Sequence, residues 1–415
     1  MTRGQGPGAA IAVLLAAGLC LWAGRLLATA EFEALPGMPP VVDRTNLYSE
    51  TAAGRLSPAV ADALPRVYVP NLESNDVYVI DPELLKVVDR FPVGPAPQHI
   101  VPSWDLKTLW VNNNGKRGGE GSVTPIDPRT GKPGPAIPVE DPYNLYFTPD
   151  GRAAIVVAER LQQLDFRDPQ EMGLQQSLAT PQCAGVNHAD FSIDGKYAIF
   201  TCEFSAGGLI KVDMTTRTIV GRLTLSRTNF AASQKPPLDG GPADAAFCGT
   251  GPRMGMPQDI RVSPDGKVFY IADMSADGVF VVDGASFTQT GFIPTGIGTH
   301  GLYPSRDGTK LYVTNRGSHS PNGRRRGPGS ISVIDFATRA VVANWPIPGG
   351  GSPDMGNVSA DGKVLWVAGR YDNVVYAINT SSGAVTTIPV GREPHGLTVW
   401  PQPGRYSLGH TGNMR

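Results

Sequence analysis

The sequence predicts an all-β protein, a seven-bladed β-propeller of four-stranded antiparallel blades, and three observations support this fold class. A short phrase built around an Asp-Gly turn recurs along the chain, as at residues 192–200 and 263–271. The copies stand about one propeller blade apart. The two ends of the repeated region are complementary, since one supplies outer strands and the other supplies an inner strand. Together these features predict a repeat array that closes into a ring.

The recurring phrase reads as a β-strand, a tight turn and a second β-strand. Asp194-Gly195 and Asp265-Gly266 each lie between strand-like runs that are rich in aromatic and β-branched residues. An Asp-Gly pair in this setting is a strong hairpin signal. The turn recurs at Asp150, Asp307 and Asp361, and degenerate copies contain Asp105 and Gln402.

Counting back seven residues from each turn gives a register mark at the start of each innermost strand. The spacings between marks are 45, 44, 71, 42, 54 and 41 residues, so the core unit is 41–45 residues long. This is about the length of a four-stranded blade. The two long spacings indicate insertions at residues 224–257 and 316–329. The marks are Gln98, Tyr143, Asn187, Gln258, His300, Asp354 and His395.

The two ends of the repeat region complete one blade together. Residues 66–92 supply outer strands with no inner strand before them, and residues 395–400 form an inner strand with nothing after it. Joining the two completes the seventh blade and removes the open sheet edges. We therefore expect a propeller at residues 66–401, followed by a C-terminal tail at 402–415.

The first thirty residues have the pattern of a secretory signal peptide. Arg3 precedes an apolar run at residues 9–24, and Ala28 and Ala30 form an Ala-x-Ala end. An uncleaved membrane anchor is the alternative, although the run is short for a full span. Residues 31–65 are predicted to form a tether. We expect a secreted, periplasmic or cell-surface protein that contacts a membrane only if the leader is retained.

The charge balance and the cysteines narrow the function further. The formal net charge is −1, which gives no electrostatic basis for binding nucleic acid. Export permits disulfides. Cys183 and Cys202 flank one Asp-Gly hairpin, so a disulfide between them is predicted. The alternative pair, Cys202 with Cys248, would attach the insertion at 224–257 to the ring.

Candidate metal ligands concentrate at the register marks. The first strands begin, and the second and fourth strands end, on the face that carries both insertions, and binding sites favour such loop-bearing faces. Four of the six histidines stand at a mark or one residue after it. Neutral imidazole is the commonest metal ligand in proteins. The predicted ligand candidates are His99, His188, His300, His395, Asp259 and Asp354.

Strand alternation limits the predicted cluster. His300 and His395 share one slot, whereas His99 and His188 share the next, so we expect two or three histidines to converge rather than four. The alternative interpretation is that these side chains fill the channel and donate hydrogen bonds. His410 lies in the tail and is expected on the opposite face, outside the site.

Polar residues near the ends of second strands are candidates for substrate binding. They are Arg370, Asn315, Asn113, Glu203 and Asp273. Arg370 would bind an anionic group, and the others would position a carbonyl or anionic substrate. The alternative is that these side chains satisfy the backbone of turns.

Two strand motifs resemble a known family. Residues 311–315 (LYVTN) and 365–368 (LWVA) resemble the YVTN-type β-propeller repeat, and the resemblance covers residues 66–401. The wider group to which this repeat is similar includes the propellers of haem-d1 nitrite reductases and quinoprotein amine dehydrogenases, as well as phosphogluconolactonase-like enzymes. The resemblance implies the fold and leaves the function open. No Cys-x-x-Cys-His motif is present, so covalent c-type haem is excluded.

These observations predict an exported propeller that binds a metal for redox chemistry on a small molecule. Copper is favoured, because a thiol left unpaired by the disulfide would stand near Met256 and His188, and sulfur with imidazole suits copper. One alternative is a non-catalytic propeller that binds a ligand, a cofactor or a cell-envelope component. The other is an enzyme resembling lactonases or lyases. A small molecule or peptide is expected on the face with the two insertions.

Overall fold

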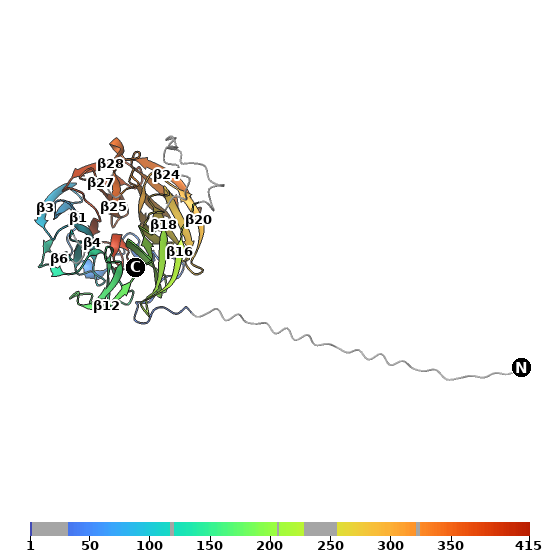
Figure 1. Cartoon of the computed structure of the whole chain (residues 1–415). Coiled ribbons are helices and arrows are strands. Elements are labelled where there is room, and N and C mark those ends of the chain that lie inside the picture. Colours follow the sequence, from blue (N-terminus) through green and yellow to red (C-terminus); the bar gives the residue numbers. More distant parts are fainter. Residues whose placement is uncertain (2–31, 117–119, 206, 228–254, 321–323) are drawn as a thin grey trace. The chain divides into compact units, whose positions relative to one another are not determined.

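The chain folds into seven β-sheets arranged in a ring around a central axis (Figure 1). The coordinates are a computed structural model, which describes residues 1, 32–116, 120–205, 207–227, 255–320 and 324–415. Neighbouring strands within each sheet are antiparallel. The predicted seven-bladed propeller is therefore confirmed. No helix within these described ranges is long and apolar enough to cross a membrane.

Six blades contain four strands each, and one contains a short fifth strand. From the inside outwards, the ring-closing blade consists of β29 (Thr398–Trp400), β1 (Arg66–Asn71), β2 (Asp76–Asp81) and β3 (Lys86–Pro92). The next two blades consist of β4 (Pro97–Pro102), β5 (Leu109–Asn113), β6 (Ser122–Asp127), β7 (Lys132–Pro133) and β8 (Ile137–Pro138), and of β9 (Pro142–Phe147), β10 (Ala154–Ala158), β11 (Gln163–Arg167) and β12 (Leu174–Ala179).

The remaining four blades follow in chain order. They are β13 (Val186–Phe191), β14 (Tyr197–Cys202), β15 (Gly208–Asp213) and β16 (Thr218–Thr224); β17 (Pro257–Val262), β18 (Val268–Asp273), β19 (Gly278–Asp283) and β20 (Thr288–Pro294); β21 (Thr299–Pro304), β22 (Lys310–Asn315), β23 (Ser330–Asp335) and β24 (Ala340–Pro346); and β25 (Pro353–Val358), β26 (Val364–Gly369), β27 (Val374–Asn379) and β28 (Val385–Pro389). Four short 3₁₀ helices in the described residues are η1 (Ser49–Thr51), η2 (Pro58–Val60), η4 (Pro348–Gly350) and η5 (His410–Gly412).

The Asp-Gly turns have the geometry that the sequence predicts. In the turn between β13 and β14, the Ser192 hydroxyl donates to Asp194 over 2.6 Å, and the same carboxylate accepts the backbone N–H of Lys196. Gly195 has a φ of 70°, a conformation that glycine adopts without steric strain. Each such turn fixes the register between an innermost strand and the strand beside it.

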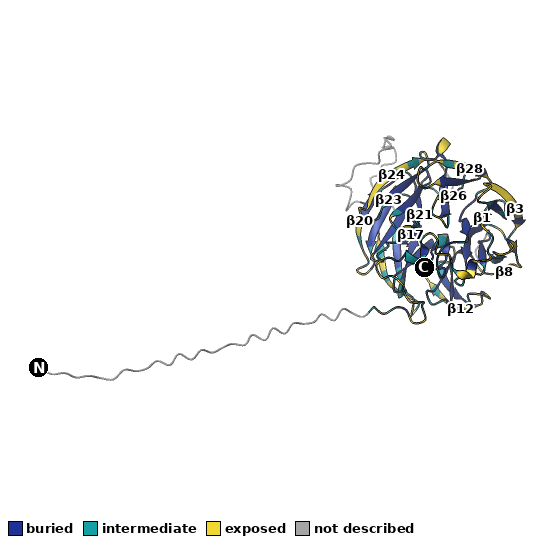
Figure 2. Ribbon diagram, turned by 180° about the vertical axis from the view of Figure 1, so that it is seen from behind, coloured by how far each residue is buried: buried dark blue, intermediate teal, exposed yellow. Residues whose placement is uncertain are grey.

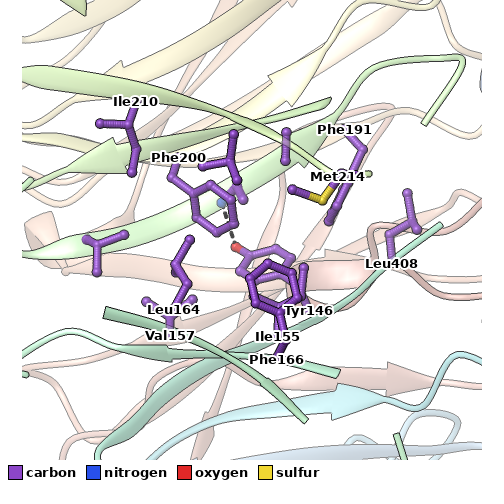
Figure 3. Close-up of a cluster of buried hydrophobic side chains, with 14 of the residues drawn as sticks. Tyr146, Ile155, Val157, Leu164, Phe166, Phe191, Phe200, Ile210, Met214 and Leu408 are labelled. Atoms are coloured by element: carbon purple, nitrogen blue, oxygen red, sulfur yellow. Dashed lines mark hydrogen bonds between the residues drawn. The ribbon is translucent and has the colours of Figure 1, made fainter. Parts of the chain in front are cut away.

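Apolar side chains pack between neighbouring blades. In the cluster of Figure 3, Tyr146 and Phe166 come from one blade, and Phe191 and Phe200 come from the next. The Tyr146 hydroxyl also accepts the backbone N–H of Ala189 over 2.8 Å, across the blade boundary. Burying each large aromatic side chain contributes on the order of 2 kcal/mol. Figure 2 shows the resulting pattern, in which buried inner strands are surrounded by an exposed rim.

The ring closes where the sequence predicts, with one local difference. Strand β29 pairs antiparallel with β1, and Val399 lies opposite Val67. However, β29 begins at Thr398, three residues after the predicted start at His395. The N–H of Gly396 instead donates to the carbonyl of Gln98 in the next blade. The chain around residues 395–397 therefore joins two blades before it enters its own sheet.

The segment before the propeller, predicted as a tether, packs along the face that carries the Asp-Gly turns. The N–H groups of Leu35 and Leu47 donate to carbonyls at Asp194 and Pro264, respectively. The hydroxyl of Tyr48 donates to the Val262 carbonyl over 2.6 Å. Residues 34–415 form one compact unit. The predicted leader at residues 1–30 lies outside the described residues, apart from Met1.

In the described residues, a disulfide joins Cys183 to Cys202, which are 19 positions apart in the sequence. It connects the chain just before β13 to the end of β14, and both cysteines are buried. Cys248, which formed the alternative pair, lies outside the described residues, as does most of the insertion at 224–257.

Candidate metal site

Irregular pairing at the start of the innermost strands determines how the candidate ligands lie. The register shifts between Pro97 and His99 in β4, and a matching shift occurs at the start of β13, β17, β21 and β25. Such bulges place an extra residue in one strand and redirect its side chain. Side chains at a register mark and at the next residue therefore need not point to opposite sides of the sheet, as simple alternation would require.

The four predicted histidines form a continuous series of neighbouring rings. The ring of His99 lies with its centroid 4.7 Å from that of His395 and 5.7 Å from that of His188. The ring of His300 lies 6.2 Å from that of His395. All four side chains are buried. The bulges bring both slots into ring contact, but of these four histidines only His188 belongs to the donor set found in the described residues.

A fifth histidine lies among them. The centroid of the His410 ring is 4.3 Å from that of His99 and 4.4 Å from that of His188. The expectation that His410 stands outside the site is wrong. After β29, the tail lies on the turn-bearing face as expected, where the N–H of Ser407 donates to the Trp104 carbonyl, but its tip, η5, reaches from that face to the histidines. In Figures 1 and 2, the C-terminus accordingly lies within the circle of blades.

Three side chains have the spacing of a metal donor set. Ligand atoms of His188, Asp259 and His410 all lie within 4.8 Å of one another, and the three residues are buried. The ring of His99 borders this set. Nitrogen and carboxylate oxygen donors at this separation suit a transition metal such as zinc, copper or iron.

Several imidazole nitrogens in the channel lack hydrogen-bond partners among the described residues. They are both ring nitrogens of His99 and the Nε2 atoms of His188, His395 and His410. His300 Nδ1 also makes no hydrogen bond of acceptable geometry, although it lies 2.9 Å from Asp354 Oδ1. A buried polar atom without a partner costs on the order of 1–3 kcal/mol, so native structures contain few of them. Four neighbouring histidines therefore carry ring nitrogens that are free to act as metal ligands.

Burial keeps the five imidazoles neutral at physiological pH. It lowers the pKa of His99, His188 and His410 well below the ordinary histidine value. The pKa of His300 falls to about 3 and that of His395 to about 4, also chiefly through burial. Neutral imidazole is the form that binds metals, so these histidines need not lose a proton before coordination.

Asp354 lies at the centre of a charged network beside the histidines. It accepts hydrogen bonds from Arg316 at 2.7 Å and from His395 Nδ1 at 2.8 Å. The Oδ1 atom that accepts from Arg316 also lies 2.9 Å from Nδ1 of His300. Burial alone would raise the pKa of Asp354, but Arg316 and the two histidines hold it well below the usual range. Asp354 therefore orients His395 through Nδ1 and leaves its Nε2 without a partner among the described residues.

The predicted substrate-binding residues divide into two groups. Asn113 and Asn315 each donate to two hydroxyl groups in their own blade, and the carboxylate of Asp273 accepts three nearby backbone N–H groups. Their side chains therefore hold the blade ends together. Glu203 and Arg370, which stand one residue after their strands, lie beside the channel instead.

Sequence reasoning missed two residues in this slot, Glu159 and Arg316. Each is the residue immediately after a second strand, as are Glu203 and Arg370. That common position was the available signal. Arg316 Nη2 lies 2.5 Å from His300 Nε2. Burial, with Glu203 as neighbour, raises the pKa of Glu159 well above the ordinary glutamate value. Burial also raises the pKa of Glu203, which accepts from Asn187 over 2.8 Å.

Solved structures of similar fold carry different activities. The periplasmic gluconolactonase PpgL of Pseudomonas aeruginosa is 18% identical with a TM-score of 0.61, covering 82% of this chain and 100% of that one. Hydrazine synthase of Kuenenia stuttgartiensis is 18% identical with a TM-score of 0.56, covering 79% and 93%. The dihydro-heme d1 dehydrogenase NirN is 14% identical with a TM-score of 0.55, covering 81% and 75%. At these identities the likeness concerns the fold alone.

A comparison with curated proteins gave no match. One family matches residues 25–232 and 250–403, which is most of the sequence. The propeller resemblance inferred from the strand motifs is thereby confirmed. The chain belongs to the family of YNCE-like beta-propellers.

Proposed function

We propose that this protein binds one transition-metal ion in its central channel and uses it for redox chemistry on a small molecule. The observation that carries the proposal is the donor set of His188, Asp259 and His410, whose ligand atoms lie within 4.8 Å of one another. His99 borders the set with both ring nitrogens unpartnered among the described residues. An ion at this place would satisfy the unpartnered nitrogens of His188 and His410. Asp259 already accepts the N–H groups of Ile260 and Leu302 and lies 3.3 Å from Arg261 Nη1, so it would share its carboxylate with the ion.

Copper is the metal that this chemistry favours. Imidazole suits copper, zinc and iron, and nitrogen and oxygen sites bind Cu²⁺ most tightly among the divalent first-row metals. The carboxylate of Asp259 would contribute the negative charge. Its pKa is raised to about 6 by burial, so it is largely ionised at neutral pH. When bound, copper would supply one-electron chemistry.

The side chains around the proposed ion favour the approach of a small molecule from the face that carries the insertions. His188 and His410 are at most 1% exposed, so the ion would be closed off from bulk solvent. Arg370, with 12% of its side chain exposed, lies between solvent and the histidines, and its Nη1 is 3.5 Å from His395 Nδ1. A guanidinium at this position would attract a small anionic molecule toward the cluster.

The proposal places the protein outside the cytoplasm. The disulfide between Cys183 and Cys202 supports this, because such bonds persist in oxidising compartments. The signal-like pattern at the N-terminus supports it as well.

Metal content is the first test. Protein purified without added metal is analysed by elemental analysis, then stripped with a chelator and titrated with Cu²⁺ and, separately, with Zn²⁺. We expect one tightly bound equivalent per chain, with Cu²⁺ bound more tightly than Zn²⁺. His188→Ala should lower the affinity for Cu²⁺ at least a hundredfold, because it removes one of the three proposed ligands. An electron paramagnetic resonance spectrum with nitrogen hyperfine splitting would identify imidazole ligands.

The matched control is His319→Ala. His319 pairs with Asp277 over 2.7 Å in a loop outside the cluster, so its loss should leave metal binding unchanged. Wild-type protein that holds less than a tenth of an equivalent, and that rebinds neither metal tightly, would contradict the proposal. The channel would then be a scaffold for a binding module without a metal.

A further inference from the structure

The C-terminal tail forms a compact arm with its own hydrogen bonds. The N–H of Arg415 donates to the carbonyl of Tyr406 over 3.0 Å, and the N–H of Leu408 donates to the carbonyl of Asn413 over 2.7 Å. These bonds close a loop whose tip is η5. We call residues 404–415 the arm. Its apolar side chains, including Leu408 and Met414, pack into two blade cores.

The tip of the arm carries a metal-ligating side chain into the channel. His410 is 1% exposed and lies between the rings of His99 and His188. Close approach of the backbone makes this placement feasible. Gly409 has a φ of 118°, and an added Cβ would lie 2.5 Å from the carbonyl oxygen of Leu145. Glycine is therefore required where the arm enters the ring.

One inner strand holds both the arm and a ligand. Asp190 of β13 accepts Arg415 Nη2 at 2.6 Å and Asn413 Nδ2 at 2.9 Å. It stands two residues after His188 and is fully buried. Buried ion pairs contribute little net stability, and their best-attested role is to fix a register. The pair of Asp190 and Arg415 therefore holds the arm in the position at which the His410 ring contacts the His188 ring.

The arm leaves a donor unpaired at its tip. His410 Nε2 has no hydrogen-bond partner among the described residues, although it is buried. Docking without an ion therefore buries a nitrogen that water would otherwise satisfy. An ion bound to this nitrogen would remove that penalty, so binding and docking would favour each other. Such linkage is reciprocal by thermodynamic necessity.

We propose that the arm carries a ligand whose docking is coupled to the ion: His410 completes the metal site from the face with the Asp-Gly turns, and Asp190 is the positioning residue that docks the arm. The inference rests on the proposed metal binding, and it adds that the ion and the arm stabilise each other. In this arrangement the docked arm lies between the proposed ion and the solvent on that face. The ion would therefore enter or leave when the arm undocks.

Hydrogen exchange and metal release test this coupling on the full-length protein. Exchange of residues 404–415 is measured in the stripped protein and after loading with Cu²⁺. We expect loading to slow exchange in the arm at least tenfold, while strand β19 stays unchanged. Arg415→Ala changes no proposed ligand, but it removes the ion pair between the arm and Asp190. It should speed chelator-driven release of Cu²⁺ about tenfold and accelerate exchange of the arm in the loaded protein.

The matched control is Arg405→Ala, which removes the same charge from the same arm. Arg405 donates to the Pro40 carbonyl at the surface and does not contact Asp190. Its release rate should equal that of the wild type. His410→Gln keeps a polar group at the tip without the imidazole, and it should bind Cu²⁺ at least tenfold more weakly while its circular dichroism stays native.

The outcomes separate the two proposals. If wild-type protein binds one Cu²⁺ while arm exchange is the same with and without the ion, and His410→Gln binds equally well, the arm proposal is overturned and the metal site stands. If wild-type protein binds no metal, the proposed function fails and the coupling fails with it.

Discussion

At the residue scale, the channel contains two kinds of buried polar group. Asp354 accepts hydrogen bonds from Arg316 and His395 and lies 2.9 Å from His300 Nδ1, and the network holds its members in defined orientations. The nitrogens of His99 and His410 are unpartnered among the described residues. Proteins retain such unpaired buried groups mainly at functional sites, because the energetic penalty is otherwise selected against. Because the histidine nitrogens lack partners and the Asp354 carboxylate does not, we place the metal on the histidines beside Asp354 and not on Asp354 itself.

Acid should destabilise the metal-free protein through these histidines. The pKa of His395 is about 4 in the folded protein, chiefly through burial, against an ordinary value of 6.5. Because the folded pKa is lowered, the stability that this group contributes is present above pH 6.5 and is lost as the pH falls toward 4. For His395 alone, the free energy of unfolding should decrease by about 2 kcal/mol between pH 7 and pH 5.

Urea denaturation of stripped protein at the two pH values measures this effect. His395→Gln should show a decrease that is smaller by about 2 kcal/mol, since glutamine does not titrate. His319→Gln, which removes a histidine outside the channel, should retain the full wild-type decrease. Equal pH dependence in all three proteins would contradict the assignment.

At the element scale, every blade except the ring-closing one has an inner strand that begins with a bulge. The bulges at His99 and at the equivalent positions of other blades are what bring side chains from both slots to the axis. A second device is the disulfide, which attaches the chain before β13 to the end of β14. This hairpin carries both His188 and Asp190, so it supports the site and the arm together.

Removing the disulfide should destabilise the protein without changing its metal stoichiometry. Closing a loop of 19 residues stabilises a protein by roughly 3 kcal/mol, mainly by restricting the unfolded chain. The double variant Cys183→Ala with Cys202→Ala should lose about this much free energy of unfolding in urea. Reduced wild-type protein should behave like the double variant. A loss below about 1 kcal/mol would show that this bond does not restrain the blade.

At the scale of the whole molecule, stability depends on closing the ring. Strand β29 completes the sheet of β1, β2 and β3, so the last strand of the propeller pairs with the first. The cores lie between blades, and each blade therefore needs both neighbours to bury its faces. An unclosed ring would expose two apolar blade faces and two sheet edges.

A charge in the closing strand should open the ring. Val399 is 5% exposed and packs with Leu397 and Val67, so Val399→Asp buries a carboxylate without a partner. We expect a loss of more than about 3 kcal/mol in the free energy of unfolding and concentration-dependent aggregation in light scattering. The same change at Val88, which is 46% exposed on β3 of that blade, should alter stability by less than about 0.5 kcal/mol. Equal effects at the two positions would contradict the closure argument.

The sequence by itself determined the architecture of this protein. Asp-Gly turns and alternating apolar residues are local signals, and their spacing specifies seven blades and the closure of β29 on β1. The sequence also located four histidines at the starts of the predicted inner strands, because the position of a residue within the repeat specifies its position in the ring.

Only the tertiary structure decided which side chains meet. A bulge at His99 and the departure of residues 395–397 from β29 override the alternation that separates His99 from His395, and both depend on pairing between strands rather than on local sequence. The arm carries no repeat, so nothing in its sequence indicated that His410 returns to the channel. Its path depends on distant contacts, namely Arg415 with Asp190 and Gly409 with Leu145, which form only once the ring has assembled.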